Sequence, residues 1–176
     1  MNIVVKSNPV FKTVHKSKNR YVVMKGFAGS GKSLDTAQQY VLKILTDKGR
    51  NLLCVRKAEV TNRDSTFAEL VKAINKMGLG AYFIATSNPL RIRCVNGNSI
   101  LFRGMNSEKE MEKLKSITVE SGTIADTWCE EGTELTKQNF EILDDRLRGE
   151  LPKCLFYHLM IVQSIKLRAL EHGIVH

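Results

Sequence analysis

The sequence predicts an α/β fold in which helices cover both faces of a mainly parallel β-sheet, with an antiparallel hairpin attached. Short apolar runs alternate with amphipathic segments along the chain, a rhythm typical of strand–helix–strand units. The dipeptide Asn96-Gly97 separates two β-prone runs, which is a strong signal for a hairpin turn. The length of 176 residues suits one domain with a substantial core. These observations together predict a three-layer sandwich.

The first half of the chain contains two strand–helix pairs. Each expected strand is a short apolar run, and each expected helix repeats its apolar residues at helical spacing. Gly78 is placed to end the second helix. The patterns predict a strand at 21–24, a helix carrying Leu34, Ala37, Val41, Leu42 and Leu45, a strand at 51–55 and a helix at 62–77.

The second half contains the hairpin and one more strand–helix pair. Asp126 interrupts the apolar run of the last expected strand, so that strand could begin only at Thr127. The last helix would turn Leu135, Ile142, Leu143 and Leu147 inward. The expected elements are strands at 81–85, 90–94 and 99–103, a helix at 107–114, a strand at 124–129 and a helix at 134–147.

A glycine-rich loop follows the first expected strand and matches the phosphate-binding pattern G-x-x-x-x-G-K-[ST]. Glycines let backbone amides point into one concavity around phosphates, and the start of the next helix adds a favourable dipole. Lys32 supplies a mobile cation, and Ser33 can place its hydroxyl on Mg2+. The match predicts a P-loop NTPase that binds ATP; the alternative is a glycine-rich turn with a solvated lysine. The loop comprises Gly26, Phe27, Ala28, Gly29, Ser30, Gly31, Lys32 and Ser33.

Two adjacent acids, Glu130 and Glu131, end the last expected strand. In a parallel sheet ligands gather at the carboxyl ends of the strands, so the loops after Met24, Val55 and Cys129 should converge on one site. Hydrolysis of a triphosphate needs one carboxylate for Mg2+ and usually another that orients the attacking water. We assign Glu130 to the metal and Glu131 to water activation. The alternative is that both are solvated charges at the start of a loop.

The chain is strongly basic, with 27 Lys and Arg against 18 Asp and Glu and a formal charge of +9. The first 20 residues contain no acid. Clustered cations favour a polyanionic partner, with nucleic acid first, although a basic balance can also serve solubility alone. The cations of this first segment are Lys6, Lys12, Lys16, Lys18 and Arg20.

Four widely spaced cysteines predict neither a zinc site nor a disulfide framework, which fits a reducing cytoplasm. Cys54 and Cys129 lie in apolar runs and are expected in the core. No apolar stretch approaches the length that spans a membrane, and no signal-type segment starts the chain. We therefore do not expect this chain to be a membrane-spanning protein.

Several other side chains allow two interpretations. Arg56 follows the second strand and could face phosphates or an acidic partner, or form an exposed turn. Arg146 and Arg148 end a helix, where cations meet its dipole favourably, with a trans-acting role in ATP hydrolysis as the alternative. Trp128 lies between strand residues, which favours a place in the core over a base-stacking platform.

Several segments, in their order and spacing, resemble the large subunit of tailed-phage terminases, PBSX type. The likeness runs from about residue 8 to residue 157, and it is carried by 26–33, 55–57, 63–67, 100–104, 113–117, 128–131, 134–135 and 145–149. The resemblance implies the ATPase half of a motor that drives double-stranded DNA into a phage procapsid. It also implies that the protein works as a homo-oligomeric ring, with the terminase small subunit and the portal as partners. The implied location is the cytoplasm of a bacterial host cell.

The resemblance implies roles for four residues: Lys32 and Ser33 on phosphate and Mg2+, Glu130 as the Walker B acid and Glu131 as the catalytic carboxylate. Glu130 stands where aspartate is usual, and Gly132 where alanine is more usual. The family continues beyond a strand like 155–157 into a coupling segment and a nuclease domain, neither of which is found here. We therefore expect an ATPase domain at 1–157, a divergent C-terminal tail at 158–176 from a truncated prophage gene, and no nuclease activity. An inactive remnant that only binds DNA or nucleotide is the alternative, and a P-loop helicase is a weaker one.

Overall fold

The computed structural model describes residue 5, residues 7–147 and, as backbone, residues 158–165. A seven-stranded sheet forms its centre. Its strands are β1 (Tyr21–Phe27), β2 (Arg50–Arg56), β3 (Phe83–Ser87), β4 (Leu90–Cys94), β5 (Ser99–Gly104), β6 (Thr123–Glu130) and β7 (His158–Ile165). The helices are η1 (Pro9–Phe11), α1 (Lys12–Lys16), α2 (Lys32–Thr46), η2 (Arg63–Phe67), α3 (Ala68–Lys76), η3 (Gly80–Tyr82), α4 (Glu108–Lys115), η4 (Gly132–Glu134) and α5 (Lys137–Arg146).

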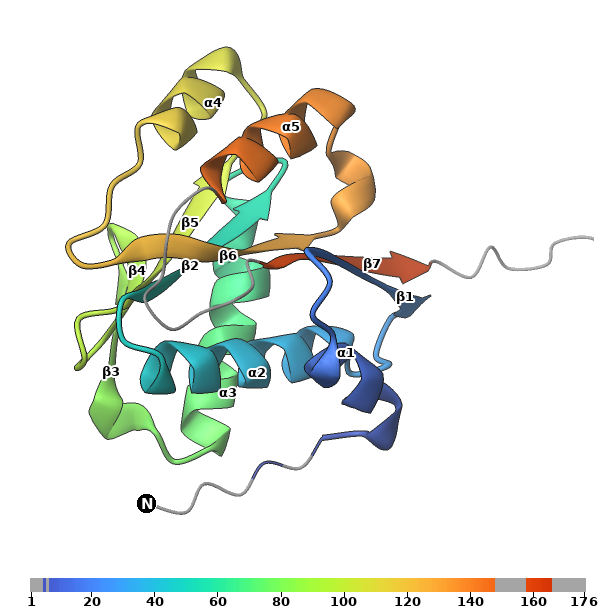
Figure 1. Cartoon of the computed structure of the whole chain (residues 1–176), viewed down its shortest axis with the longest axis vertical. Helices are drawn as coiled ribbons and strands as arrows, with labels where there is room; N and C mark the ends of the chain where they lie inside the picture. Colours follow the sequence, from blue (N-terminus) through green and yellow to red (C-terminus); the bar gives the residue numbers. More distant parts are fainter. Residues whose placement is uncertain (1–4, 6, 148–157, 166–176) are drawn as a thin grey trace, which may run out of the picture.

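The sheet has the order β1-β7-β6-β2-β5-β4-β3. The first five strands in that order run parallel, whereas β4 is antiparallel to both β5 and β3. Helices α2 and α3 lie on one face, and α4 and α5 lie on the other (Figure 1). Each face buries its own apolar cluster against these helices. The predicted three-layer α/β sandwich with an attached antiparallel hairpin is confirmed.

Most expected elements occur where the sequence placed them, with three differences. The helix expected at 62–77 consists of the π-helical segment η2 followed by α3, and it ends before Gly78 as predicted. β3 begins at Phe83 because 80–82 form the short helix η3. The last helix begins at Lys137, since Thr136 and Asn139 form a capping box that sets its start.

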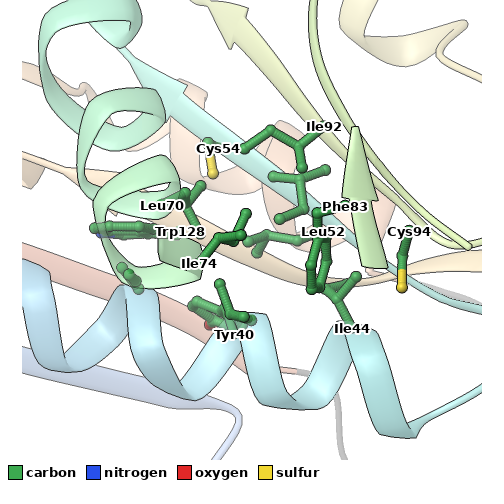
Figure 2. Close-up of a cluster of buried hydrophobic side chains, with 14 of the residues drawn as sticks. Tyr40, Ile44, Leu52, Cys54, Leu70, Ile74, Phe83, Ile92, Cys94 and Trp128 are labelled. Atoms are coloured by element: carbon green, nitrogen blue, oxygen red, sulfur yellow. The ribbon is translucent and has the colours of Figure 1, made fainter. Parts of the chain in front are cut away.

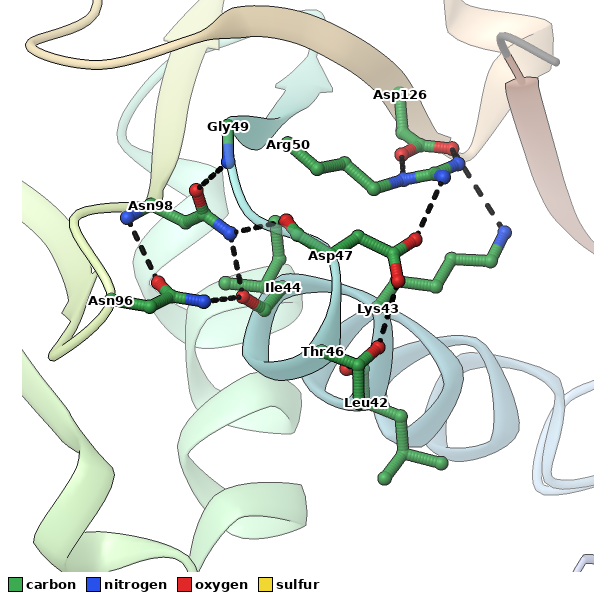
Figure 3. A network of polar contacts seen from close by, with 10 residues as sticks. All are labelled: Leu42, Lys43, Ile44, Thr46, Asp47, Gly49, Arg50, Asn96, Asn98 and Asp126. Atoms are coloured by element: carbon green, nitrogen blue, oxygen red, sulfur yellow. Dashed lines mark hydrogen bonds and ion pairs between the residues drawn. The ribbon is translucent and has the colours of Figure 1, made fainter. Parts of the chain in front are cut away.

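The strand expected at 124–129 is present as β6, which runs from Thr123 to Glu130, so Asp126 does not shorten it. Asp126 is fully buried, and its carboxylate accepts hydrogen bonds from Arg50 Nε at 2.5 Å and Nη2 at 2.9 Å. Arg50 also pairs with Asp47 at 3.1 Å, and Lys43 Nζ lies 3.9 Å from Asp126 (Figure 3). A polar residue is thus accommodated inside the strand by an ion-pair network.

A β-bulge in β6 decides which face its later side chains occupy. Ile124 pairs with Asn51 and Asp126 with Leu52, so Ala125 is an extra residue in the ladder. Ile124 packs in the cluster under α4 and α5, whereas Trp128, four residues later, packs under α2 and α3. Strict alternation would put both side chains on one face. The bulge therefore turns the second half of β6 toward α2.

Strand β7 lies between β1 and β6, paired in parallel with both. Its register places Tyr21 beside Leu159 and Phe27 beside Ile165. The predicted division after residue 157 therefore does not mark the end of the sheet. The strand expected at 155–157 and the residue Arg148 lie outside the described residues.

The core beneath α2 and α3 is dense and largely apolar (Figure 2). Trp128, Tyr40 and Cys54 are all almost completely inaccessible to solvent. Cys129 is fully buried on the other face, so the predicted core positions of Cys54 and Cys129 are confirmed, as is that of Trp128. Burial raises the pKa of the Cys54 thiol well above its usual value. Among the described helices, none has the length and apolar character needed to cross a membrane.

Candidate functional site

The glycine-rich loop joins β1 to α2 at the carboxyl edge of the parallel strands. Gly29 and Gly31 have φ values of 76° and 86°, a left-handed conformation that glycine adopts without a Cβ clash. Helix α2 then begins at Lys32, directly after this turn. Backbone amides in the first turn of a helix have no partner within the helix and carry the positive end of its dipole. The loop therefore has the local structure of an anion site.

Lys32 places its ammonium group inside the loop. Its Nζ donates to the carbonyl oxygens of Gly26 at 2.9 Å and Phe27 at 2.8 Å, and to Ser30 Oγ at 3.0 Å. The residue is only 6% exposed. A cation held at this depth beside the start of α2 adds to the positive potential there.

Ser33 and Glu130, 97 residues apart in sequence, meet directly. Ser33 Oγ donates to Glu130 Oε1 at 2.6 Å, and the indole Nε1 of Trp128 donates to Oε2 at 2.8 Å. Burial raises the pKa of the Glu130 carboxyl group, and the hydrogen bonds from Ser33 and Trp128 oppose that rise. A hydroxyl and a carboxylate are hard oxygen ligands of the kind that Mg2+ takes, so these two residues fit the predicted metal role.

Glu131 follows at the tip of β6 in an unusual backbone conformation. Its φ of 52° makes it the one non-glycine residue with positive φ among those that the structure describes. The left-handed conformation costs an ordinary residue roughly 1–2 kcal/mol. Such strain concentrates at functional sites, where a side chain must point in a particular direction. The negative charge of Glu131 contributes to the raised pKa of Glu130, which places the two acids in one electrostatic environment.

Of the three arginines with open roles, Arg56 and Arg146 lie in the described part of the chain, and both have polar partners. Arg56 Nη2 lies 3.2 Å from Glu134 Oε1, which ties the end of β2 to η4 after β6. Its charge also lowers the pKa of Glu130, so Arg56 belongs to the same edge of the sheet. Arg146 Nη2 donates to the carbonyl oxygen of Ile117 at 2.6 Å. This contact anchors the end of α5 to the loop after α4.

The sequence interpretation missed a brace between the N-terminal segment and α2. Asp35, in the first turn of α2, is 4% exposed and accepts hydrogen bonds from Ser7 Oγ at 2.5 Å and His15 Nε2 at 2.7 Å. Phe11 is buried in the core cluster under α2. The residues lie 20 or more positions apart, so no local pattern could have paired them. The brace holds η1 and α1 against the helix that carries the glycine-rich loop.

Comparison with known proteins gives a consistent result. A family model described as "Phage terminase large subunit" matches residues 18–163. The PBSX phage terminase large subunit of Bacillus subtilis (strain 168) is 35% identical over 147 residues, which cover 83% of this chain and 32% of that protein. The chain spans about one third of the length of the curated relatives that it matches.

Solved structures share the fold. The large terminase from a thermophilic bacteriophage aligns with a TM-score of 0.64 at 13% identity, over 88% of this chain and 37% of that one. The complex of that terminase with ADP aligns with a TM-score of 0.60. The ATPase domain of the Thermus phage P74-26 large terminase aligns with a TM-score of 0.61 at 16% identity, over 92% of this chain and 66% of that one. At such low sequence identity, the alignments show that the fold is shared and nothing more.

Proposed function

The chain belongs to the phage terminase large-subunit family, and from that premise we propose that it is the ATP-hydrolysing P-loop domain of a DNA-packaging motor. One observation carries the proposal: Ser33, after the glycine-rich loop, and Glu130, at the tip of β6, meet at 2.6 Å. This contact unites the two halves of a triphosphate site, which are far apart in sequence. A large terminase from a thermophilic bacteriophage, which shares this fold, has been solved with bound ADP.

In the proposed site each residue acts on a different part of the triphosphate. The loop amides and the Lys32 ammonium would hold the phosphate oxygens, while Ser33 and Glu130 would hold Mg2+. When bound, Mg2+ would neutralise charge on the phosphate oxygens. Glu131 orients a water molecule and accepts its proton as the water oxygen bonds to the terminal phosphorus. The bond from that phosphorus to the bridging oxygen breaks, which yields ADP and inorganic phosphate.

Replacing Lys32 by Ala tests the proposal. We expect ATP hydrolysis to fall by about 100-fold or more, since each lost charge-assisted contact to a phosphate is worth about 1.5–3 kcal/mol in binding and more in the transition state. Phosphate release by the purified protein and the affinity for a fluorescent ATP analogue measure the effect. Lys25→Ala, which removes an exposed lysine from β1, is the matched control. Hydrolysis unchanged by Lys32→Ala would refute the site, and a folded wild type without nucleotide affinity would favour the inactive remnant.

We place double-stranded DNA on the basic N-terminal segment. A groove of about 640 Å3 there is lined by Lys12, Lys16 and Lys18, together with small polar and apolar residues, and no acid lines it. Lysines that neutralise backbone phosphates release counterions, which makes the affinity dependent on salt. The His15–Asp35 contact links the same segment to α2.

Replacing Lys12, Lys16 and Lys18 together by Ala should weaken DNA binding. The slope of log affinity against log salt should become shallower by about 0.9 for each lysine that contacts a phosphate. Fluorescence anisotropy of a labelled duplex at several salt concentrations measures both effects. A triple alanine variant at the exposed Lys48, Lys72 and Lys76 changes the net charge equally and should keep most of the affinity. Equal losses in the two variants would mean that net charge, not this groove, binds DNA.

The remaining partners follow from the family premise. We propose that the domain works in a homo-oligomeric ring with a terminase small subunit and the portal, in the cytoplasm of a bacterial host. The predicted domain division and the absence of nuclease activity remain predictions. Robust metal-dependent DNA cleavage by the purified chain would contradict the second of these.

A further inference from the structure

Trp128 is the chain's single tryptophan, and it is fully buried on the α2 side of β6. It lies two residues before Glu130, so the two side chains occupy the same face of the strand. An indole N–H is a donor only, and a buried donor without an acceptor costs about 1–3 kcal/mol. Its acceptor is Glu130 Oε2 at 2.8 Å. The only polar group of this core tryptophan thus donates its hydrogen bond to the candidate metal ligand Glu130.

The indole ring is held in place by the helix that carries the glycine-rich loop. Tyr40, in α2, stacks on Trp128 with ring centroids 6.2 Å apart and ring planes at 27° (Figure 2). Both rings are almost completely buried. A donor fixed in a packed core has little freedom, so the oxygen that it contacts is fixed as well.

The two oxygens of Glu130 therefore have separate partners. Oε2 accepts from Trp128, and Oε1 accepts from Ser33. The terminal torsion of a glutamate is broad and roughly two-fold, so an unrestrained carboxylate would sample many orientations. With Oε2 held, Oε1 remains directed at the Ser33 hydroxyl.

We propose that Trp128 is a positioning residue, which holds the Glu130 carboxylate so that Oε1 and the Ser33 hydroxyl face the same Mg2+. This inference rests on the proposed function of the site. Mg2+ demands near-ideal octahedral geometry, so a freely rotating carboxylate binds it less well. Groups that orient a metal ligand typically contribute 10- to 100-fold to metal affinity.

Trp128→Phe keeps an aromatic ring against Tyr40 and removes the donor. We expect the Mg2+ concentration needed for half-maximal ADP binding to rise about 10- to 100-fold, while ADP affinity in EDTA stays the same. Phe102→Leu is the matched control, because Phe102 is a fully buried aromatic residue of the same core cluster and its loss perturbs packing alone. An equal Mg2+ requirement in Trp128→Phe and wild type would overturn the proposal.

A second measurement uses the metal-free wild-type protein and does not depend on how the Trp128 variant folds. The single indole N–H gives one signal in a nitrogen–proton correlation spectrum, expected to exchange slowly with solvent and to lie downfield. Glu130→Ala should move this signal and speed its exchange, and an unmoved signal would overturn the contact. If Glu130→Ala moves the indole signal, Trp128→Phe raises the Mg2+ requirement for ADP binding, and the wild-type protein does not hydrolyse ATP, the proposed function fails and the positioning role stands.

Discussion

Replacing Glu131 by Gln should lower the rate of ATP hydrolysis by about 10²- to 10⁴-fold. Glutamine has the shape of glutamate and can still contact water, but it cannot accept the proton that the attacking water releases. ATP affinity should stay close to that of wild type, because Lys32, Ser33 and Glu130 are intact. Steady-state phosphate release and ATP binding measure the two effects. If the Glu131→Gln variant hydrolyses ATP as fast as wild type, Glu131 is not the catalytic carboxylate.

Two further substitutions separate the chemistry of Glu131 from its backbone strain. Glu131→Ala removes the carboxylate but keeps a Cβ in the left-handed conformation, whereas Glu131→Gly removes both. Both should be inactive, but the glycine variant should be about 1 kcal/mol more stable toward unfolding than the alanine variant. Equilibrium denaturation with urea gives the comparison. Equal stabilities would mean that the φ of 52° costs this protein nothing.

Replacing Asp126 by Ala should destabilise the fold by about 3–5 kcal/mol. Asp126 is fully buried and receives two hydrogen bonds from Arg50, so its removal leaves a largely buried guanidinium group with its main counter-charge missing. Urea denaturation of the purified variant measures the loss.

An exposed ion pair serves as the control for this loss. Glu112 accepts from Lys115 at 2.8 Å and is 70% exposed, so Glu112→Ala should cost no more than about 1 kcal/mol. Replacing Arg50 and Asp126 together by Met and Leu should recover much of the lost stability, because neither buried charge of the pair is then left without its partner. An Asp126→Ala variant as stable as Glu112→Ala would show that the buried pair is unimportant.

Much of the fold and part of the site could be predicted because the signals are local. The glycine-rich loop, its strand and its helix are contiguous, and each follows from residue type and spacing. The meeting of Ser33 and Glu130 was expected from one long-range rule, that parallel strands end at the same edge of a sheet.

Contacts that depend on strand register or on packing between distant segments could not be predicted from local sequence patterns. β6 is buried on both faces, so its apolar run gives no alternation that would reveal the bulge at Ala125 or the side on which Trp128 lies. Asp126 appeared as an interruption because its partner Arg50 lies on another strand. The Asp35 brace likewise depends on a packing contact between two distant segments.

The extra residue in β6 marks a place where this strand can change length during evolution. Asp126, Trp128 and Glu130 all follow the bulge and contact α2, at Lys43, Tyr40 and Ser33 respectively. Losing Ala125 would leave Ile124 beside Asn51 and Asp126 beside Leu52 in a regular ladder, so each of these side chains would keep its face. A deletion of one residue after Asp126 would instead move Trp128 and Glu130 to the face of α4 and α5. The strand can therefore lose a residue at the bulge, but not beyond it, if Glu130 is to stay beside the glycine-rich loop.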